Sequence, residues 1–247
     1  MDLALITGAS RGIGRATALM LAQAGYCVAV NYRKRATEAQ QVVTEIEALG
    51  GSALAVQADI ADEAQVVRMF QQLDQHAGSL RVLVNNAGIL FTQCRVEDLN
   101  AERIQRVFAT NVTGTFICCR EAVKRMSTDH GGQGGSIINV SSAAARLGAP
   151  GEYVDYAASK GAMDTLTKGL SLEVAAQGIR VNSVRPGLIY TEMHADGGEP
   201  GRVDRVASSL PMQRGGQAEE IAAAIIWLAS DAASYVTGTF IDAAGGR

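Results

Sequence analysis

The feature that most constrains the fold of this sequence is a regular alternation of short apolar runs with longer amphipathic segments. Apolar runs of this length are typical of buried β-strands, and the amphipathic segments repeat their apolar residues at helical spacing. Seven runs are predicted to be strands: LALIT (3–7), YCVAVN (26–31), ALAVQ (53–57), RVLVNN (81–86), SIINVS (136–141), IRVNSV (179–184) and TFIDA (239–243). Helices are predicted near residues 13–24, 36–49, 62–76, 101–127, 156–176 and 217–230.

This alternation predicts parallel βαβ units, in which each helix carries the chain back to start the next strand. Strands that are apolar along nearly their whole length fit a sheet covered by helices on both faces. No stretch of the sequence reads as a linker between domains. We therefore expect one α/β domain over residues 1–247, with a doubly wound, mostly parallel seven-stranded sheet flanked by helices. Ligands should bind at the carboxyl ends of the strands.

Composition excludes several classes of protein. The net charge is −3 and no basic stripe is present, so we expect no nucleic-acid partner. No apolar run reaches the length of a membrane span, and the first residues do not resemble a signal peptide. None of the four cysteines has metal-site spacing, which predicts reduced thiols, no metal and a cytoplasmic location. The cysteines are Cys27, Cys94, Cys118 and Cys119.

The segment TGASRGIG (7–14) follows the first predicted strand and opens the first predicted helix. Gly8, Gly12 and Gly14 allow a sharp turn and close approach of the backbone to a pyrophosphate, which the helix N-terminus attracts. The glycine spacing differs from the common G-x-G-x-x-G. Its place between a strand and a helix nevertheless favours dinucleotide binding over a purely structural turn.

The end of the second predicted strand bears on the choice of cofactor. NAD-binding proteins usually carry an acidic residue here, whereas this chain has NYRKR (31–35). Arg33, together with Arg11, could clamp a 2′-phosphate, although a solvated basic turn is the alternative interpretation. The sequence favours NADP(H), with NAD(H) possible.

Taken in order, the motifs of this chain resemble those of the classical short-chain dehydrogenase/reductase family. The resemblance covers essentially the whole chain and rests on TGASRGIG (7–14), DI (59–60), NNAG (85–88), Asn111, NVSS (139–142), YAASK (156–160) and RPGLIYT (185–191). Through NYR and PGEYVDYAASK the chain is similar to bacterial members grouped with sugar 1-dehydrogenases and 3-oxoacyl reductases. The resemblance implies a Rossmann-type fold and hydride transfer between a nicotinamide and a small carbonyl compound or secondary alcohol.

The resemblance also implies where the cofactor lies. Asp59 and Ile60 should border the adenine ring, residues 86–88 should line the trough, and residues 186–191 should hold the nicotinamide end. The expected cofactor-binding residues are Gly8, Ser10, Arg11, Gly12, Ile13, Gly14, Tyr32, Arg33, Asp59, Ile60, Asn86, Ala87, Gly88, Tyr156, Lys160, Pro186, Gly187, Ile189 and Thr191.

Tyr156 and Lys160 are the candidates for proton chemistry. A phenol is too weakly acidic to serve as a base at neutral pH, and a nearby ammonium lowers its pKa. The two residues are four apart, so on a helix their side chains share a face. We expect Tyr156 to donate or accept the proton and Lys160 to lower its pKa and, by the resemblance, to hold the nicotinamide ribose.

A hydroxyl donor must also hold the substrate oxygen as charge develops on it. The family usually places this serine 13 positions before the tyrosine, where this chain has Ala143. Ser142 lies 14 positions before Tyr156 and is the better match, with Ser141 as the fallback. By the resemblance, Asn111 links Lys160 to solvent through water and locally distorts its helix.

Two alternative functions remain open. Tyr153 stands seven positions before Lys160, the spacing of enoyl reductases, which act on a C=C bond. Pro150 and Gly151 suggest instead that Tyr153 lies on a loop entering the helix, where it could line the substrate pocket. The other alternative is a dinucleotide-sensing protein without catalysis, because a fold alone does not establish chemistry.

The substrate pocket should draw on residues 90–95, 146–153 and 190–212, with DGGEPG (196–201) as a mobile lid. The polar candidates for binding substrate hydroxyls are Gln93, Glu152 and His194. Three arginines near these segments are too scattered to indicate an acyl-carrier-protein partner: Arg125, Arg146 and Arg202. Small residues in the helix after Tyr156 and an apolar final strand predict, with the resemblance, a homotetramer.

Overall fold

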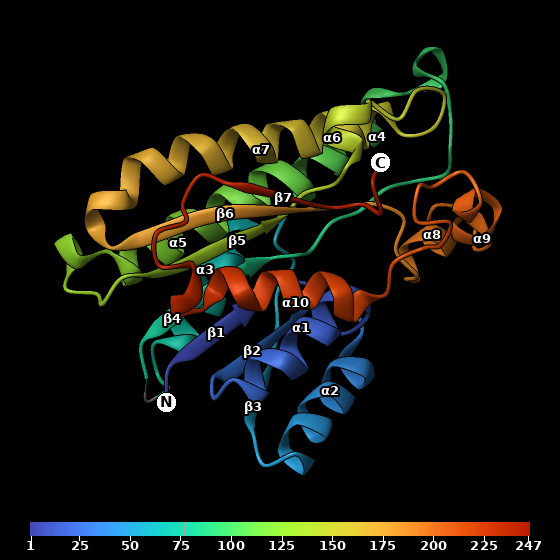
Figure 1. The fold of residues 1–247 in the computed structure, drawn as a ribbon. Helices are drawn as coiled ribbons and strands as arrows, with labels where there is room; N and C mark the ends of the chain where they lie inside the picture. Colours follow the sequence, from blue (N-terminus) through green and yellow to red (C-terminus); the bar gives the residue numbers. More distant parts are fainter. Residues whose placement is uncertain (77) are drawn as a thin grey trace.

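A computed structural model describes residues 1–76 and 78–247 and has an α/β fold with seven parallel strands in one sheet (Figure 1). The strand order is β3-β2-β1-β4-β5-β6-β7, and each neighbouring pair is parallel. The strands are β1 (Leu3–Ile6), β2 (Cys27–Tyr32), β3 (Ser52–Gln57), β4 (Leu80–Asn85), β5 (Gly135–Val140), β6 (Ile179–Pro186) and β7 (Phe240–Ala243). This architecture confirms the predicted fold class.

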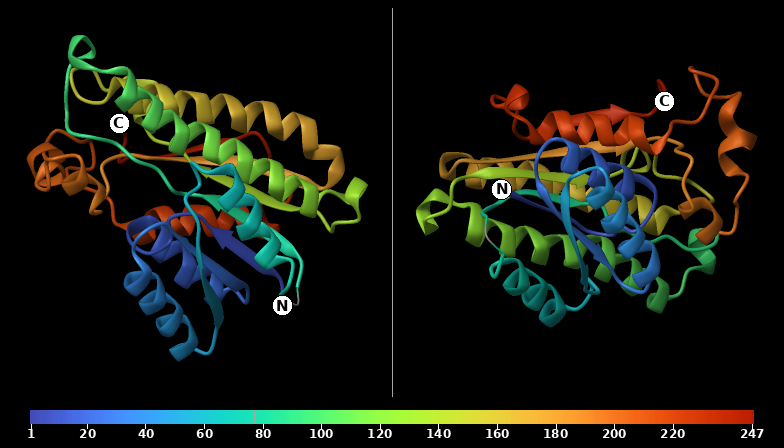
Figure 2. Two further views of the ribbon diagram at one scale, coloured as in Figure 1. Left: turned by 180° about the vertical axis from the view of Figure 1, so that it is seen from behind. Right: turned by 90° about the horizontal axis from the view of Figure 1, so that it is seen from below.

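Helices cover both faces of the sheet, as the two further views show (Figure 2). The longer helices are α1 (Gly12–Gln23), α2 (Ala36–Ala48), α3 (Glu63–Leu73), α4 (Ala101–Phe108), α5 (Thr115–Met126), α7 (Val154–Val174) and α10 (Ala218–Ala229). The shorter ones are α6 (Ala144–Leu147), α8 (Met193–Asp196) and α9 (Arg202–Ala207). Single 3₁₀ turns are η1 (Val96–Asp98), η3 (Thr128–His130), η4 (Ala175–Gln177) and η5 (Asp231–Ala233).

The strands are largely apolar because successive side chains enter two different cores. Ile137 of β5 packs in the core that contains Phe70 of α3, whereas its neighbour Ile138 packs in the core that contains Leu228 of α10. None of the helices among the described residues has the length and apolar character needed to cross a membrane.

Each of the seven predicted runs overlaps a strand. Each predicted helix is present, and one of them is interrupted. The segment predicted as one helix over 101–127 consists of α4, a π-helical turn η2 (Ala109–Gly114) and α5. Helix α7 begins at Val154, two residues before the predicted start. The sequence analysis missed α6, α8 and α9 because four to six residues are too few for a periodic apolar pattern.

The strand order places a binding crevice at one edge of the sheet. The chain winds outward from β1 to β3 and then crosses to β4 on the other side of β1. The loops that follow β1 and β4 therefore diverge at the carboxyl ends of these strands, which is where ligands bind in open α/β sheets. Asn86, just after β4, donates its side-chain amide to the carbonyls of Thr7 and Gly8 at 3.0 Å each, so the two loops are fixed to one another.

Candidate active site

The glycine-rich loop after β1 has the geometry of a phosphate-binding turn. Gly8 has φ +63°, a conformation that strains any residue with a Cβ. A Cβ on Gly14 would lie 2.5 Å from both the Gly8 carbonyl oxygen and the Asn86 side chain, so helix α1 can pack closely only with glycine at this position. The free amides at the start of α1 then face the crevice, where a pyrophosphate fits.

A cavity of about 750 Å³ extends from this loop along the carboxyl ends of the strands. Thirteen of the predicted cofactor-binding residues line it: Gly8, Ser10, Arg11, Gly12, Ile13, Tyr32, Arg33, Asp59, Ile60, Asn86, Ala87, Gly88 and Thr191. Its volume is within the range of cofactor and ligand sites. The residues present therefore fit a dinucleotide.

Other predicted cofactor residues stand behind the wall of this cavity. Gly14 packs α1 against the loop, and Ile189 is buried and bridges to Gly216. Gly187 donates its amide to the Ala243 carbonyl at 3.0 Å, which joins the end of β6 to β7. Pro186 is buried at the end of β6. These residues hold the strand ends in place.

Several lining residues escaped the sequence analysis. The guanidinium of Arg106 lies 4.8 Å from the centroid of the Phe91 ring, and both side chains line the cavity together with Thr110, Met193 and Asp196. Phe91 lies in a segment that the sequence suggested for the substrate pocket. Arg106, by contrast, carries no signal, because only the packing of α4 against the loop after β4 brings it to the site.

The two arginines predicted to bind a 2′-phosphate both line the cavity, and each has a carboxylate partner. Arg33 Nη1 lies 3.6 Å from Asp59 Oδ2, a half-exposed pair. Arg11 donates to Asp196, which belongs to the lid helix α8. The lid therefore reaches across the cavity to the glycine-rich loop, a contact that the sequence did not predict.

Tyr156 and Lys160 are both buried, one turn apart on α7. The Lys160 Nζ donates to the Val140 carbonyl oxygen at 2.7 Å and lies 5.6 Å from the centroid of the Tyr156 ring. Burial lowers the pKa of Lys160 to about 8, and the carboxylate of Asp164 opposes this shift. The same burial raises the pKa of Tyr156 to about 12.

The expected lowering of the Tyr156 pKa by Lys160 is therefore not found, because the largest effect on this phenol is its desolvation by burial, which raises the pKa. A hydrogen bond from Ser142 opposes the rise in the Tyr156 pKa. Because the pKa of Lys160 is about 8, its ammonium is only partly charged above neutral pH, and this weakens its effect on the phenol.

The two serines after β5 have different surroundings. Ser142 is partly buried, bonds to Tyr156, and accepts the Ala144 amide at 3.1 Å. Ser141 is buried and donates to the Lys160 carbonyl oxygen at 3.3 Å. The geometry places the Ser142 hydroxyl beside the candidate acid, and it places Ser141 in a contact that joins the strand end to α7.

Asn111 lies in the π-helical turn η2, where the helix is distorted as the resemblance implied. Its Oδ1 accepts the Ile89 amide at 2.8 Å, and its Nδ2 donates to the Ile89 carbonyl at 2.9 Å and to Ser159 Oγ at 3.0 Å. These bonds tie the chain after β4 to α7. They leave the predicted water link to Lys160 as a prediction.

The three polar pocket candidates lie on or beside residues 193–207, which contain α8, the predicted lid (196–201) and α9. Gln93 donates to Glu199 at 2.7 Å, and Glu152 accepts from Arg202 of α9 at 2.6 Å. A ring nitrogen of His194 lies 3.0 Å from the Ile189 carbonyl oxygen, and burial lowers the pKa of this histidine. Arg202, which was expected to be one of three scattered arginines, therefore pairs with one of the three pocket candidates.

Tyr153 is the N-cap residue of α7, in agreement with its predicted place on a loop entering the helix. Its side chain is buried. The guanidinium of Arg202 lies 5.0 Å from the centroid of its ring. No contact between Tyr153 and Lys160 is found among residues 1–76 and 78–247.

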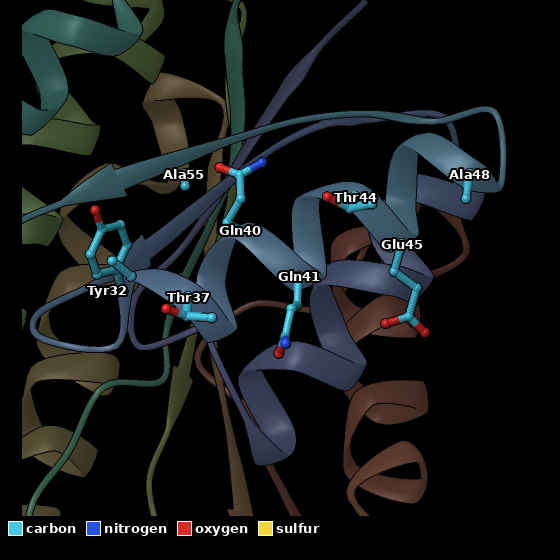
Figure 3. A pocket seen from close by; sticks show the side chains of 9 residues that line it. Tyr32, Thr37, Gln40, Gln41, Thr44, Glu45, Ala48 and Ala55 are labelled. Carbon is cyan, nitrogen blue, oxygen red and sulfur yellow. The ribbon is translucent and has the colours of Figure 1, made fainter.

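A second cavity, of about 710 Å³, lies outside the site along α2 (Figure 3). Its wall includes Tyr32, Gln40, Thr44 and Glu45, most of them on the exposed side of that helix. None of the candidate proton-transfer residues lines it.

Comparison with known proteins places the chain among oxidoreductases. A family model described as enoyl-(acyl carrier protein) reductase matches residues 8–247. An uncharacterized oxidoreductase of Escherichia coli, YgfF, is 72% identical over 247 residues and is covered completely, as is this chain. The 3-oxoacyl-(acyl-carrier-protein) reductase FabG of Staphylococcus aureus is 41% identical, with 98% of this chain and 96% of the relative aligned.

Solved structures agree with this relationship. A short-chain type dehydrogenase/reductase from Mycobacterium marinum superposes with a TM-score of 0.92 at 38% identity, over 99% of this chain and 94% of that one. A short-chain dehydrogenase/reductase from Serratia marcescens gives 0.90 at 36% identity, over 99% and 97%. Both the sequence and the fold relationships extend over nearly the full length of the chain, and it therefore belongs to the short-chain dehydrogenase/reductase family of oxidoreductases.

Proposed function

We propose that this protein is an NADP(H)-dependent oxidoreductase that interconverts a carbonyl compound and a secondary alcohol. The observation that carries the proposal is the buried Tyr156–Lys160 pair, with Ser142 beside the phenol. The pair is close to the cavity along the glycine-rich loop, because a Cβ on Gly88 in the cavity wall would lie 3.5 Å from Lys160 Nζ. The Staphylococcus aureus relative is named for the reduction of a 3-oxoacyl group, which is a ketone and fits this class of reaction.

The bound nicotinamide supplies the hydride in reduction and accepts it in oxidation. In the direction of reduction, a hydride adds to the carbonyl carbon and the Tyr156 hydroxyl gives its proton to the carbonyl oxygen. The Lys160 ammonium stabilises the phenolate that remains, and the Ser142 hydroxyl donates to the oxygen on which charge develops. In oxidation the Tyr156 phenolate takes the proton from the alcohol. Asn111 holds the segment after β4 against α7 and so positions the pair.

Replacing the candidate acid tests this assignment. Tyr156→Phe removes the proton donor while leaving the ring in place, so kcat for ketone reduction should fall roughly 100- to 10,000-fold, the usual contribution of a general acid. The affinity for NADPH, measured by fluorescence titration, should stay within about twofold, since the cavity keeps its lining. Tyr26→Phe, at the start of β2 and remote from the site, is the matched control. Turnover of Tyr156→Phe close to that of the wild type would disprove the role.

The family model that matches residues 8–247 is described as enoyl-(acyl carrier protein) reductase, so the enoyl-reductase alternative is tested as well. If Tyr153 were the acid, Tyr153→Phe would abolish reduction of crotonyl-coenzyme A, and Tyr156→Phe would retain it. The position of the lysine favours Tyr156, whose ring lies 5.6 Å from Lys160 Nζ. A wild type that binds NADPH but reduces neither ketones nor enoyl thioesters would instead support a dinucleotide-sensing role.

The lowered pKa of Lys160 predicts the pH dependence of reduction. Below pH about 8 the ammonium is charged and stabilises the phenolate left on Tyr156, and above that value the charge is lost. The kcat/KM for ketone reduction should therefore be level at lower pH and decline as the pH rises through about 8. In Lys160→Arg, whose guanidinium stays charged, the remaining activity should show no decline in this range.

Circular dichroism at each pH separates loss of the charge from loss of the fold. A wild-type profile that rises through pH 8, or a Lys160→Arg profile with the same decline as the wild type, would contradict the assignment of the titrating group to Lys160.

The preference for NADP(H) rests on the basic end of the cavity. Four basic residues line it: Arg11, Arg33, Lys34 and Arg35. The Arg33–Asp59 ion pair is exposed and 3.6 Å long, so it is weak and a phosphate can replace the carboxylate. Arg33→Ala should raise the KM for NADPH about 10- to 100-fold, the worth of a charge-assisted hydrogen bond, and leave that for NADH nearly unchanged. Arg15→Ala is the control, because Arg15 pairs with Glu45 away from the cavity. Equal changes for both cofactors would refute phosphate recognition by Arg33.

We also propose that the protein is a homotetramer. Leu172 of α7 is 70% exposed and Phe116 of the adjacent α5 is exposed as well, while Trp227 and Tyr235 expose apolar surface near β7. Two separate apolar surfaces suit two two-fold interfaces, which together close a tetramer. Light scattering should give four times 25.9 kDa, and Leu172→Glu should give a smaller species. Leu49→Glu, at the end of α2, is the matched exposed control, and a monomeric wild type would overturn the proposal.

A further inference from the structure

Two buried polar atoms beside the lid have no hydrogen-bond partner among the residues that the structure describes. They are the Tyr153 hydroxyl oxygen and the Arg202 Nη1. Tyr153 is 5% exposed and Arg202 is 9% exposed, and the guanidinium lies 5.0 Å from the centroid of the tyrosine ring. Buried donors are nearly always paired, because leaving one unpaired costs its lost hydration. Two such groups side by side indicate that a further oxygen binds here.

The position of these two groups fits the substrate side of the site. Tyr153 caps the helix that carries Tyr156 one turn later, and residues three apart on a helix have Cβ atoms about 5–6 Å apart. The lid closes over the Tyr153 hydroxyl, since a Cβ on Gly197 would stand 3.3 Å from that oxygen. If the two hydroxyls are about as far apart as these Cβ atoms, a ligand oxygen held by Tyr153 lies about two or three carbons from a carbon that reacts at Tyr156.

The charges around these groups select the kind of oxygen. Arg202 Nη2 donates to Glu152 at 2.6 Å, and Arg202 Nη1 is 3.8 Å from Glu199, which also accepts from Arg205. The charges of the two arginines and the two glutamates cancel. A carboxylate or phosphate of a ligand would therefore be repelled by the glutamates with no net positive charge to attract it. A saturated alkyl chain would leave both donors unpaired. A neutral hydroxyl or carbonyl oxygen satisfies both conditions.

We propose that Tyr153 and Arg202 form a substrate-binding subsite for a neutral oxygen two or three carbons from the reacting carbon. The inference rests on the proposed reaction and narrows its substrates to carbonyl compounds, and their alcohols, that carry a second oxygen. The Arg202 Nη1 donates to that oxygen, and the Tyr153 hydroxyl donates to it or accepts from it.

Matched ketones test the subsite with NADPH as the reductant. The pair 4-hydroxy-2-butanone and 2-pentanone differs by one hydroxyl, and the pair methyl acetoacetate and 4-methyl-2-hexanone tests a carbonyl oxygen. Wild-type kcat/KM should favour the oxygenated ketone of at least one pair by about 10- to 100-fold, the range for a hydrogen bond to a charged group. A preference in one pair alone supports the subsite and identifies the kind of oxygen it binds.

Two variants assign this preference to the two side chains. Tyr153→Phe and Arg202→Met should each reduce the ratio of kcat/KM values within the pair about tenfold or more, because one donor to the ligand oxygen is gone. The ratio cancels general effects on the lid or on stability, which act on both ketones alike. Arg214→Met is the matched control: Arg214 pairs with Glu220, outside the charges around the subsite, and its side chain is 48% exposed. Its ratio should stay within about twofold of the wild type.

The outcomes separate this inference from the proposed reaction. A wild type that reduces these ketones without preference in either pair overturns the subsite and leaves the reaction standing. A preference that survives in both Tyr153→Phe and Arg202→Met also overturns the subsite and leaves the reaction standing. A wild type that reduces none of the four ketones with NADPH or NADH overturns the proposed reaction, and the subsite falls with it.

Discussion

The hydrogen bond between the Lys160 ammonium and the Val140 carbonyl is the contact on which the site depends. A buried ammonium is costly unless it is paired, and here its partner is the last residue of β5, 2.7 Å away. This bond fixes the rotation of α7 against the sheet. Tyr156, one turn earlier on α7, is thereby set beside Ser142, two residues past the strand end. The position of the proposed proton donor is thus linked to how one buried charge is satisfied.

The lid is held by polar contacts with both sides of the site. Asp196 accepts from Arg11 of the glycine-rich loop, and Glu199 accepts from Gln93 after β4. Arg202 bonds to Glu152 just before α7. Side chains proposed to meet cofactor phosphate or substrate oxygens are therefore the same ones that hold this segment. The Arg11–Asp196 pair lies partly in water and contributes little, so a bound phosphate can replace it.

The sequence predicted most of the fold because strand and helix periodicities are local properties. It also predicted the glycine-rich turn and the proton-transfer candidates, since their spacing is short and their context is a strand followed by a helix. The lid contacts had no such signal. Arg11 and Asp196 are 185 residues apart, and Arg202 lies 50 residues from Glu152, so only the folded chain shows which carboxylate each arginine meets. The raised pKa of Tyr156 was also missed, because burial cannot be read from a tyrosine–lysine spacing.

The loop before α7 explains how the spacing between Ser142 and Tyr156 can differ by one residue from the family pattern. Gly148, Ala149 and Gly151 all have positive φ, at 74°, 45° and 72°. For Ala149 this backbone is unfavourable, and a tight loop that absorbs an extra residue can require it. Because the irregularity ends before Val154, the helical register of Tyr156 and Lys160 is unaffected. The same loop ends in Glu152 and Tyr153, so an extra residue here would alter the proposed substrate side of the site and leave the proposed proton-transfer groups in place.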